Sequence, residues 1–219
     1  MRHRLQSWAA FAALLLVPIA ASAADLVFSV TEGVTYQATP KEIRDKFEPL
    51  AQALGTALKR TVRVVLVPRY DDMRAGLAKQ EYDLAFIHPA HVALAEVKAG
   101  RYKTLAWTAG YTEYTVSLMV KANDPAKGLA DVGATAATAV VKEWTDKGGR
   151  VFLKSRSVPI KYFIVSTKLP ADEQAQIQRA LVSLAQTDPG RQVLAAVGYK
   201  GFLMPDPAID AAAIDWLGL

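Results

Sequence analysis

The stretch "VRVVLVPRYDDMRAGLAKQEYDLAFIHPAHVALAEV", residues 62–97, decides the fold class. Its two apolar runs, 62–67 and 82–87, predict buried strands, the first being rich in β-branched residues. The segments that follow them, 70–80 and 89–100, predict helices. Strands and helices alternate, which favours an α/β fold with a largely parallel sheet. Because the strands are almost continuously apolar, we expect helices on both faces of that sheet.

The same alternation begins earlier in the chain. Residues 25–30, "DLVFSV", alternate apolar and polar side chains and predict a first strand. A helix is expected to begin after Thr39, because Thr39 suits the N-cap, Pro40 suits the first helical position, and Glu42 completes a capping box. Pro49 interrupts the apolar pattern of this helix and predicts a kink.

The N-terminal residues 1–24 have the pattern of a secretory signal peptide. Two arginines precede an apolar run, which ends at the A-x-A sequence Ala21–Ala23. A membrane anchor would need ~20 consecutive apolar residues, and this run is shorter. We therefore expect export to the periplasm, with cleavage near Ala23 or Ala24.

Composition limits the classes of function. The chain has 219 residues and a formal net charge of +5, which falls to +3 when Arg2 and Arg4 are removed. This charge is too small to indicate a nucleic-acid-binding protein, although a slightly basic exported protein can favour anionic solutes. The chain has no cysteine, which excludes disulfides and thiolate metal sites. An ordinary hydrophobic core must hold the fold, and a chain of this length can bury one.

The later part of the chain predicts a smaller second lobe. We expect lobe 1 at residues 25–114, a shortened lobe 2 at 115–166, and C-terminal helices at 167–219 that pack back on lobe 1. The elements predicted after residue 100 are strands at 103–109, 114–121, 150–155 and 158–167, and helices at 135–149, 170–187 and 188–202.

Polar side chains follow three predicted strands at the points where the chain turns into a helix. These residues are Tyr70, His88 and Thr135. Ligands of open α/β sheets bind outside the carboxyl ends of the strands, and helix N-termini offer backbone N–H groups to oxyanions. The pattern therefore predicts a site for a small anionic solute. His91 lies inside the following helix, where it either contacts the ligand or packs against its neighbours.

Other readings of the histidines involve metal binding, catalysis or local structure. A zinc site usually needs three or four ligands, and His88 and His91 are accompanied only by scattered carboxylates. Nucleophilic catalysis lacks a G-x-S-x-G motif and a cysteine, and no glycine-rich phosphate loop is present. His88 could also be a turn residue whose ring bonds only to backbone. We expect no cofactor, no metal and no catalytic activity.

Several segments together carry a family resemblance. They are "FSVTEG", "PLAQALGTAL", "VPRYDDMRAGLAKQEYDLAFIHPA", "ADVGATAA" and "GGRVFLKSRSVPIKYFIVSTKLP". With the signal peptide, they resemble the phosphate/phosphite/phosphonate-type substrate-binding proteins of ABC transporters, which are type 2 periplasmic binding proteins. The resemblance implies a monomeric, two-lobed clamp that closes on a small phosphorus oxyanion and presents it to an inner-membrane permease.

The resemblance also implies ligand contacts. Tyr70 matches a tyrosine that follows the second strand in the family, and His88 lies in the family's next contact turn. With these we expect Tyr36, His91 and Thr135 to contact the ligand. The family's main oxyanion site is a Ser/Thr-rich helix N-terminus in lobe 2. Here the chain passes directly from residues 124–127 to 128–131, so one or two βα units of ~30 residues each are missing.

Three functions remain open at this stage. The first is the solute-binding component of an importer for phosphonate-, phosphite- or phosphate-type oxyanions. The second is a periplasmic sensory or input module, and the third is a truncated family member with impaired ligand binding. Neighbouring permease and ATPase genes would favour transport, whereas a neighbouring sensor kinase gene would favour signalling.

Overall fold

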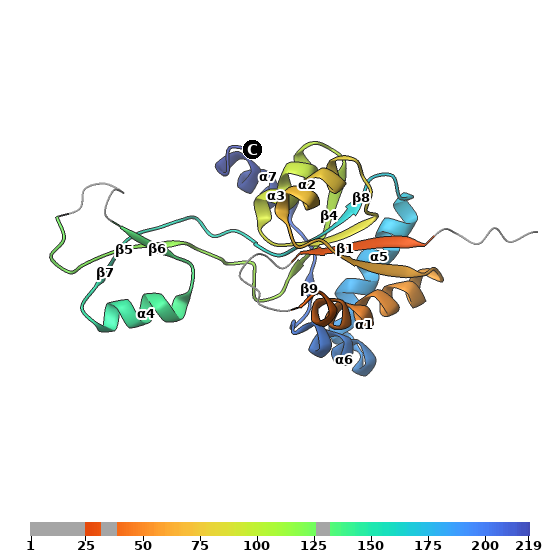
Figure 1. The fold of residues 1–219 in the computed structure, drawn as a ribbon, viewed down its shortest axis with the longest axis horizontal. Coiled ribbons are helices and arrows are strands. Elements are labelled where there is room, and N and C mark those ends of the chain that lie inside the picture. The colour runs from red at the N-terminus through yellow and green to blue at the C-terminus, as the bar shows by residue number, and fades with distance from the viewer. Residues whose placement is uncertain (1–24, 32–38, 126–131) are drawn as a thin grey trace, which may run out of the picture.

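The computed structural model describes residues 25–31, 39–125 and 132–219 (Figure 1). Within these residues the strands form two sheets, in the orders β2-β1-β3-β8-β4-β9 and β6-β5-β7. We call the part built on the six-stranded sheet the large lobe and the part built on the three-stranded sheet the small lobe. The predicted two-lobed α/β fold with a shortened second lobe is confirmed. Tyr36, one of the predicted ligand contacts, lies outside the described residues.

The large sheet combines a parallel group of strands with an antiparallel one. Its strands are β1 (Leu26–Thr31), β2 (Val62–Leu66), β3 (Leu84–Ile87), β4 (Tyr102–Thr108), β8 (Tyr162–Ser166) and β9 (Phe202–Leu203). β1 pairs in parallel with both β2 and β3, whereas β8 lies antiparallel between β3 and β4. β8 falls in the range 115–166 that the sequence assigned to lobe 2. The chain thus returns to the large lobe earlier than expected.

Helices cover both faces of the large sheet (Figure 1). One face carries α1 (Pro40–Leu58), α5 (Ala171–Ser183), the 3-10 turn η1 (Leu184–Gln186) and α6 (Asp188–Val197), and the other carries α2 (Tyr70–Ala78), α3 (Ala90–Lys98) and α7 (Pro207–Trp216). Phe86 and Phe163 lie in the core on the α1 side, while Ile87 and Ile164 lie in the core on the α3 side. Successive strand residues point to opposite faces, so each central strand contributes to both cores.

The predicted start of α1 is confirmed in detail. The Thr39 side chain accepts a hydrogen bond from the Glu42 backbone N–H at 3.3 Å, and the Glu42 carboxylate accepts one from the Thr39 N–H at 2.7 Å. Pro40 occupies the first turn, and Pro49 lies inside the helix. Phe47 and Leu50 are fully buried, so this helix covers the centre of the α1-side core.

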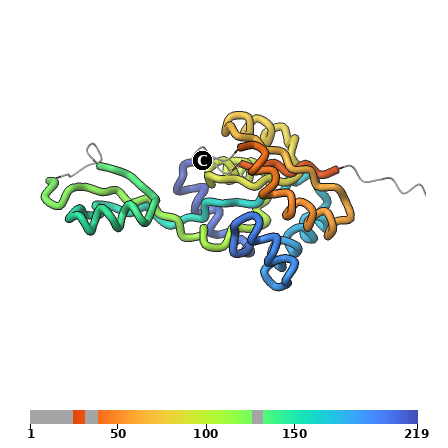
Figure 2. Tube along the Cα trace, turned by 60° about the horizontal axis from the view of Figure 1, so that its bottom comes forward, coloured from red at the N-terminus to blue at the C-terminus, as the bar shows by residue number. Residues whose placement is uncertain are grey.

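The small lobe lies apart from the large lobe at the end of two extended segments (Figures 1 and 2). Its elements are β5 (Ser117–Val120), β6 (Gly133–Thr135), α4 (Thr138–Asp146) and β7 (Arg150–Lys154), with β5 antiparallel between the other two strands. We call residues 111–116 and 155–161 the connecting arms, which are bridged where Tyr114 pairs with Val158. No residue of α4 is buried, and Leu153 is 54% exposed. Among the described residues, the small lobe therefore has little hydrophobic core.

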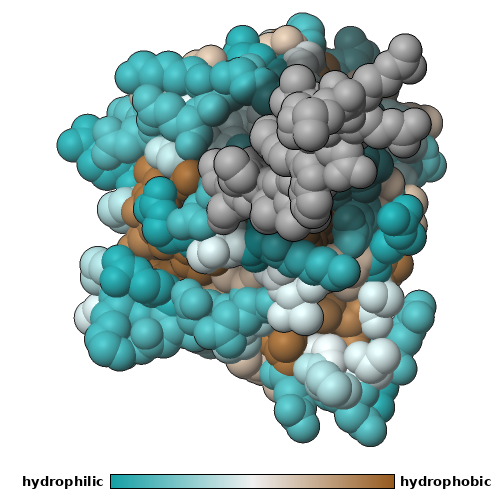
Figure 3. Space-filling view, turned by 90° about the vertical axis from the view of Figure 1, so that its right-hand side faces the viewer, coloured by the Kyte–Doolittle hydropathy of each residue, from teal (hydrophilic) through white to brown (hydrophobic). Residues whose placement is uncertain are grey.

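The surface of the large lobe is mainly hydrophilic at the end opposite the small lobe (Figure 3). Where hydrophobic residues are visible there, they lie between hydrophilic ones. In the parts of the chain that the structure describes, no helix combines the length and hydrophobicity required to traverse a bilayer.

Candidate ligand-binding site

Because β1, β2 and β3 run in parallel, their carboxyl ends lie together at one end of the large sheet. The Val67 N–H donates to the Val30 carbonyl at 3.0 Å, and the His88 N–H donates to the Thr31 carbonyl at 3.2 Å. The chain then turns into α2 and α3, whose first turns carry N–H groups that have no partner within the helix. We call these carboxyl ends, with Thr31, Tyr70 and His88, the strand-end site. It is the position at which α/β sheets bind small ligands.

The ring of His88 is oriented by one of the connecting arms. Its Nδ1 lies 3.1 Å from the carbonyl oxygen of Ile160, which is in the second arm, two residues before β8. A carbonyl only accepts hydrogen bonds, so Nδ1 carries the proton and donates it. The side chain is half-buried, and the His88–Pro89 peptide bond is cis. Through its hydrogen bond to Ile160, His88 therefore links the strand-end site to one of the connecting arms.

His91 lies one turn further along α3 and contacts α2. Its Nε2 is 3.0 Å from a guanidinium nitrogen of Arg74, which also approaches Asp71 at 3.4 Å. Burial, and then the positive charges of Arg74 and His88, lower the pKa of His91. Arg74 always donates, so Nε2 accepts and the ring is neutral. In the described part of the chain, no group of three His, Cys, Asp or Glu side chains is arranged to hold a metal ion.

The other predicted residues are placed in different ways. Tyr70 is half-buried at the first position of α2, directly after the β2 turn. Thr135 ends β6 in the small lobe, and its hydroxyl accepts the Ala137 N–H at 3.1 Å before α4 begins. The small lobe lies away from the large sheet, so the structure does not bring Thr135 to His88 (Figure 1). Tyr70, His88 and His91 are on neighbouring elements of the large lobe.

A group of lysines and tyrosines that the sequence did not predict lies near the strand-end site. We call Lys46, Tyr111, Lys161 and Tyr199 the Tyr199 cluster. Lys161 Nζ donates to the Tyr199 hydroxyl at 2.9 Å and lies 4.5 Å from the Tyr111 ring centroid. Lys46 Nζ lies 5.2 Å from the Tyr199 ring centroid. Lys161 directly precedes an apolar strand, but only the pairing of that strand with β3 places it near His88.

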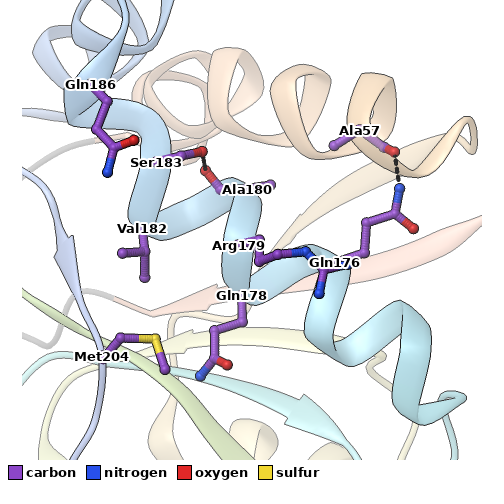
Figure 4. Close-up of a pocket in the computed structure, with 9 residues that line it drawn as sticks. All are labelled: Ala57, Gln176, Gln178, Arg179, Ala180, Val182, Ser183, Gln186 and Met204. Carbon is purple, nitrogen blue, oxygen red and sulfur yellow. Dashed lines mark hydrogen bonds between the residues drawn. The ribbon is translucent and has the colours of Figure 1, made fainter.

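Two cavities lie away from the strand-end site. One of ≈550 Å³ is on the outer face of α5, where Gln178 and Val182 lie near Met204 (Figure 4). Another of ≈310 Å³ lies between the connecting arms and α7, beside Ile209 and Trp216. Neither is lined by the strand ends, and the lining of the first is held by glutamine bonds to neighbouring backbone, such as Gln178 to the Leu105 carbonyl at 2.8 Å.

A protein-family model described as "ABC transporter, phosphonate, periplasmic substrate-binding protein" matches residues 33–145 and 126–208. The chain belongs to this family. It is a substrate-binding protein of a family that serves ABC transporters in the periplasm. The two matches overlap at residues 126–145. No curated protein sequence matches the chain.

Solved structures with low sequence identity share the fold. PhnD1 from Prochlorococcus marinus, in complex with methylphosphonate, is 9% identical with a TM-score of 0.62, and the match covers 87% of this chain and 96% of that chain. A binding protein component of an ABC phosphonate transporter from Pseudomonas aeruginosa is 13% identical with a TM-score of 0.62, covering 89% and 85%. A Xanthomonas citri protein bound to ATP is 12% identical with a TM-score of 0.61, covering 85% and 93%. The predicted periplasmic-binding-protein fold is confirmed.

Proposed function

We propose that this chain is the solute-binding component of an ABC importer and binds a phosphonate-, phosphite- or phosphate-type oxyanion at the strand-end site. Tyr70 and His88 are the main contacts from the large lobe, and His91 contributes less. Tyr36 and Thr135 complete the ligand contacts when the lobes close. The protein binds and delivers its ligand without catalysing a reaction.

The observation that carries this proposal is the family match over residues 33–208 combined with the geometry of His88. A histidine whose Nδ1 donates to the Ile160 carbonyl has a fixed ring plane, and in its protonated form the ring directs its second N–H, on Nε2, to the ligand. Half-burial of His88 and Tyr70 leaves part of each side chain accessible at the turn. The first turns of α2 and α3 add backbone N–H donors, which suit an oxyanion.

We also propose that the protein acts in the periplasm as a monomer. Residues 1–24 form a signal peptide that is cleaved near Ala23 or Ala24, and the partner is the permease in the inner membrane. Mass spectrometry of the protein purified from the periplasm tests the cleavage site. An N-terminus upstream of residue 20 would contradict it.

Calorimetric titration tests the ligand class. The protein purified from the periplasm is titrated with methylphosphonate, phosphite and phosphate, and we expect saturable binding of at least one of them. His88→Ala should weaken that binding by about tenfold or more, since a hydrogen bond to a charged partner contributes about 1.5–3 kcal/mol. Gln52→Ala, at an exposed position of α1, is the control and should leave binding unchanged. A folded protein that binds none of the three anions would refute the proposal.

A further inference from the structure

The side chain of Arg74 bridges α2 and α3, which lie side by side in the large lobe (Figure 1). Its Nη2 is 3.0 Å from Nε2 of His91, which lies in the first turn of α3, three residues after His88. Tyr70 lies one turn before Arg74 on α2, so the two side chains share a face of that helix. Side chains of a helix lean toward its N-terminus, which for α2 is the turn after β2. The guanidinium of Arg74 thus lies beside the turns that form the strand-end site.

The guanidinium of Arg74 makes few polar contacts. Nη2 contacts His91, and Nη1 approaches a carboxylate oxygen of Asp71 at 3.4 Å. Within the residues that the structure describes, the guanidinium has no third polar partner. A guanidinium carries five N–H donors, so these two contacts leave three donors for a ligand. Its planar fork can bond to two oxygens of one oxyanion at the same time.

His91 holds this guanidinium without neutralising it. The His91 ring is neutral and accepts a hydrogen bond from Arg74, so Arg74 keeps its full positive charge. His91 is half-buried, whereas the side chain of Arg74 is 48% exposed. One end of the guanidinium is therefore fixed while the rest is accessible to a solute, which preorganises a cation beside the strand-end site.

Asp71 is the anion that balances Arg74 in the absence of a ligand. It precedes Arg74 by three residues on α2, and its side chain is 79% exposed. Exposed ion pairs of this kind are weak, because water screens the two charges and the side chains are free to separate. A phosphorus oxyanion offers a bidentate contact and up to two negative charges in place of one carboxylate contact. It can therefore displace Asp71, whose side chain then turns into water.

We infer that Arg74 is a further ligand-binding residue, which exchanges its contact with Asp71 for a phosphorus oxyanion while His91 keeps it in position. This inference rests on the proposed function and names the positively charged group that favours an anion at the strand-end site. It also gives Asp71 a role in specificity, because an uncharged solute cannot displace the carboxylate from the guanidinium.

Calorimetric titration of two variants with methylphosphonate and with inorganic phosphate tests this exchange. Arg74→Met removes the charge and keeps an unbranched side chain. We expect it to weaken binding by about tenfold or more, because a charge-assisted hydrogen bond is lost. Asp71→Asn removes the competing charge and should strengthen binding by about two- to fivefold, since the ligand no longer has to break an exposed ion pair.

The matched control is the ion pair between Asp188 and Arg191 at the start of α6. It has the same spacing as the pair of Asp71 and Arg74 and a similar side-chain exposure, 86% and 54%. It lies on the opposite face of the large sheet. Arg191→Met and Asp188→Asn should each change the affinity by less than about twofold, because screening weakens the effect of distant exposed charges.

The outcomes separate this inference from the proposed function. If the natural protein binds an anion and Arg74→Met binds it equally well, Arg74 has no role in ligand binding, while the proposed function stands. If the natural protein, folded by circular dichroism, binds neither anion, the proposed function fails and this inference fails with it. If Arg74→Met does not fold, Asp71→Asn decides: stronger binding supports the exchange, and unchanged or weaker binding overturns it.

Discussion

Asp210 is a buried carboxylate that holds the C-terminal helix α7 against the large sheet. Asp210 is 5% exposed. Its Oδ1 accepts hydrogen bonds from Trp107 Nε1 at 3.2 Å and from the Tyr162 hydroxyl at 3.1 Å. Asp210→Ala leaves two buried donors without an acceptor, at about 1–3 kcal/mol for each donor. We expect the free energy of unfolding to fall by about 2–5 kcal/mol, which lowers Tm by about 5–15 °C for a chain of this size.

Asp210→Asn separates the hydrogen bonds from the charge, because it keeps Oδ1 as an acceptor. Burial raises the pKa of Asp210, and hydrogen bonds from Tyr162 and Trp107 lower it in part. The pKa in the folded protein thus lies above the unfolded value of about 3.9. The carboxyl then stabilises the fold more as the pH falls through the folded pKa, and its contribution levels off below the unfolded pKa. Relative to Asp210→Asn, the natural protein should lose stability as the pH rises.

Urea unfolding at several pH values between about 4 and 7 measures both effects. Asp215→Asn, an exposed position on the same helix, is the control for a change of charge on α7. The reasoning is wrong if Asp210→Ala unfolds at the same urea concentration as this control. It is also wrong if the stability difference between the natural protein and Asp210→Asn does not change with pH.

Three further predictions concern the fold. Thr39→Ala removes the cap of α1 and should lower stability by about 1 kcal/mol in thermal unfolding; an unchanged Tm would contradict the role of the cap. Gly190→Ala should destabilise by about 1–3 kcal/mol, because a Cβ there would lie 2.0 Å from the Leu184 carbonyl oxygen, and a stable variant would show that the contact relaxes freely. Trp144→Ala removes the hydrogen bond to the Val120 carbonyl at 3.0 Å, so hydrogen exchange should increase in the small lobe alone; faster exchange in the large lobe would contradict the independence of the lobes.

Local sequence signals predicted much of the large lobe. The capping box at Thr39, the apolar runs of β2 and β3, and the turns before α2 and α3 each depend on residues close in sequence. The position of His88 at a strand end followed from the same local pattern. These features need no knowledge of which distant segments meet.

Features that depend on distant pairing were not predicted. β8 inserts antiparallel between β3 and β4, and nothing in the run Tyr162–Ser166 specifies its neighbours. The Tyr199 cluster also depends on this pairing. The packing of α6 against α1 is needed as well, because it brings Tyr199 to both Lys46 and Lys161. His91 also bonds with Arg74, a residue of a different helix, so its neutral state could not be inferred from the spacing of the two histidines.

The most direct test of the account is a crystal structure of the periplasmic protein with methylphosphonate, at a concentration that saturates binding in solution. The account predicts the phosphonate group at the ends of β1 and β3, with an oxygen within hydrogen-bond distance of His88. Occupation of the cavity on α5 or of the groove beside Trp216, with the strand-end site containing only water, would contradict it.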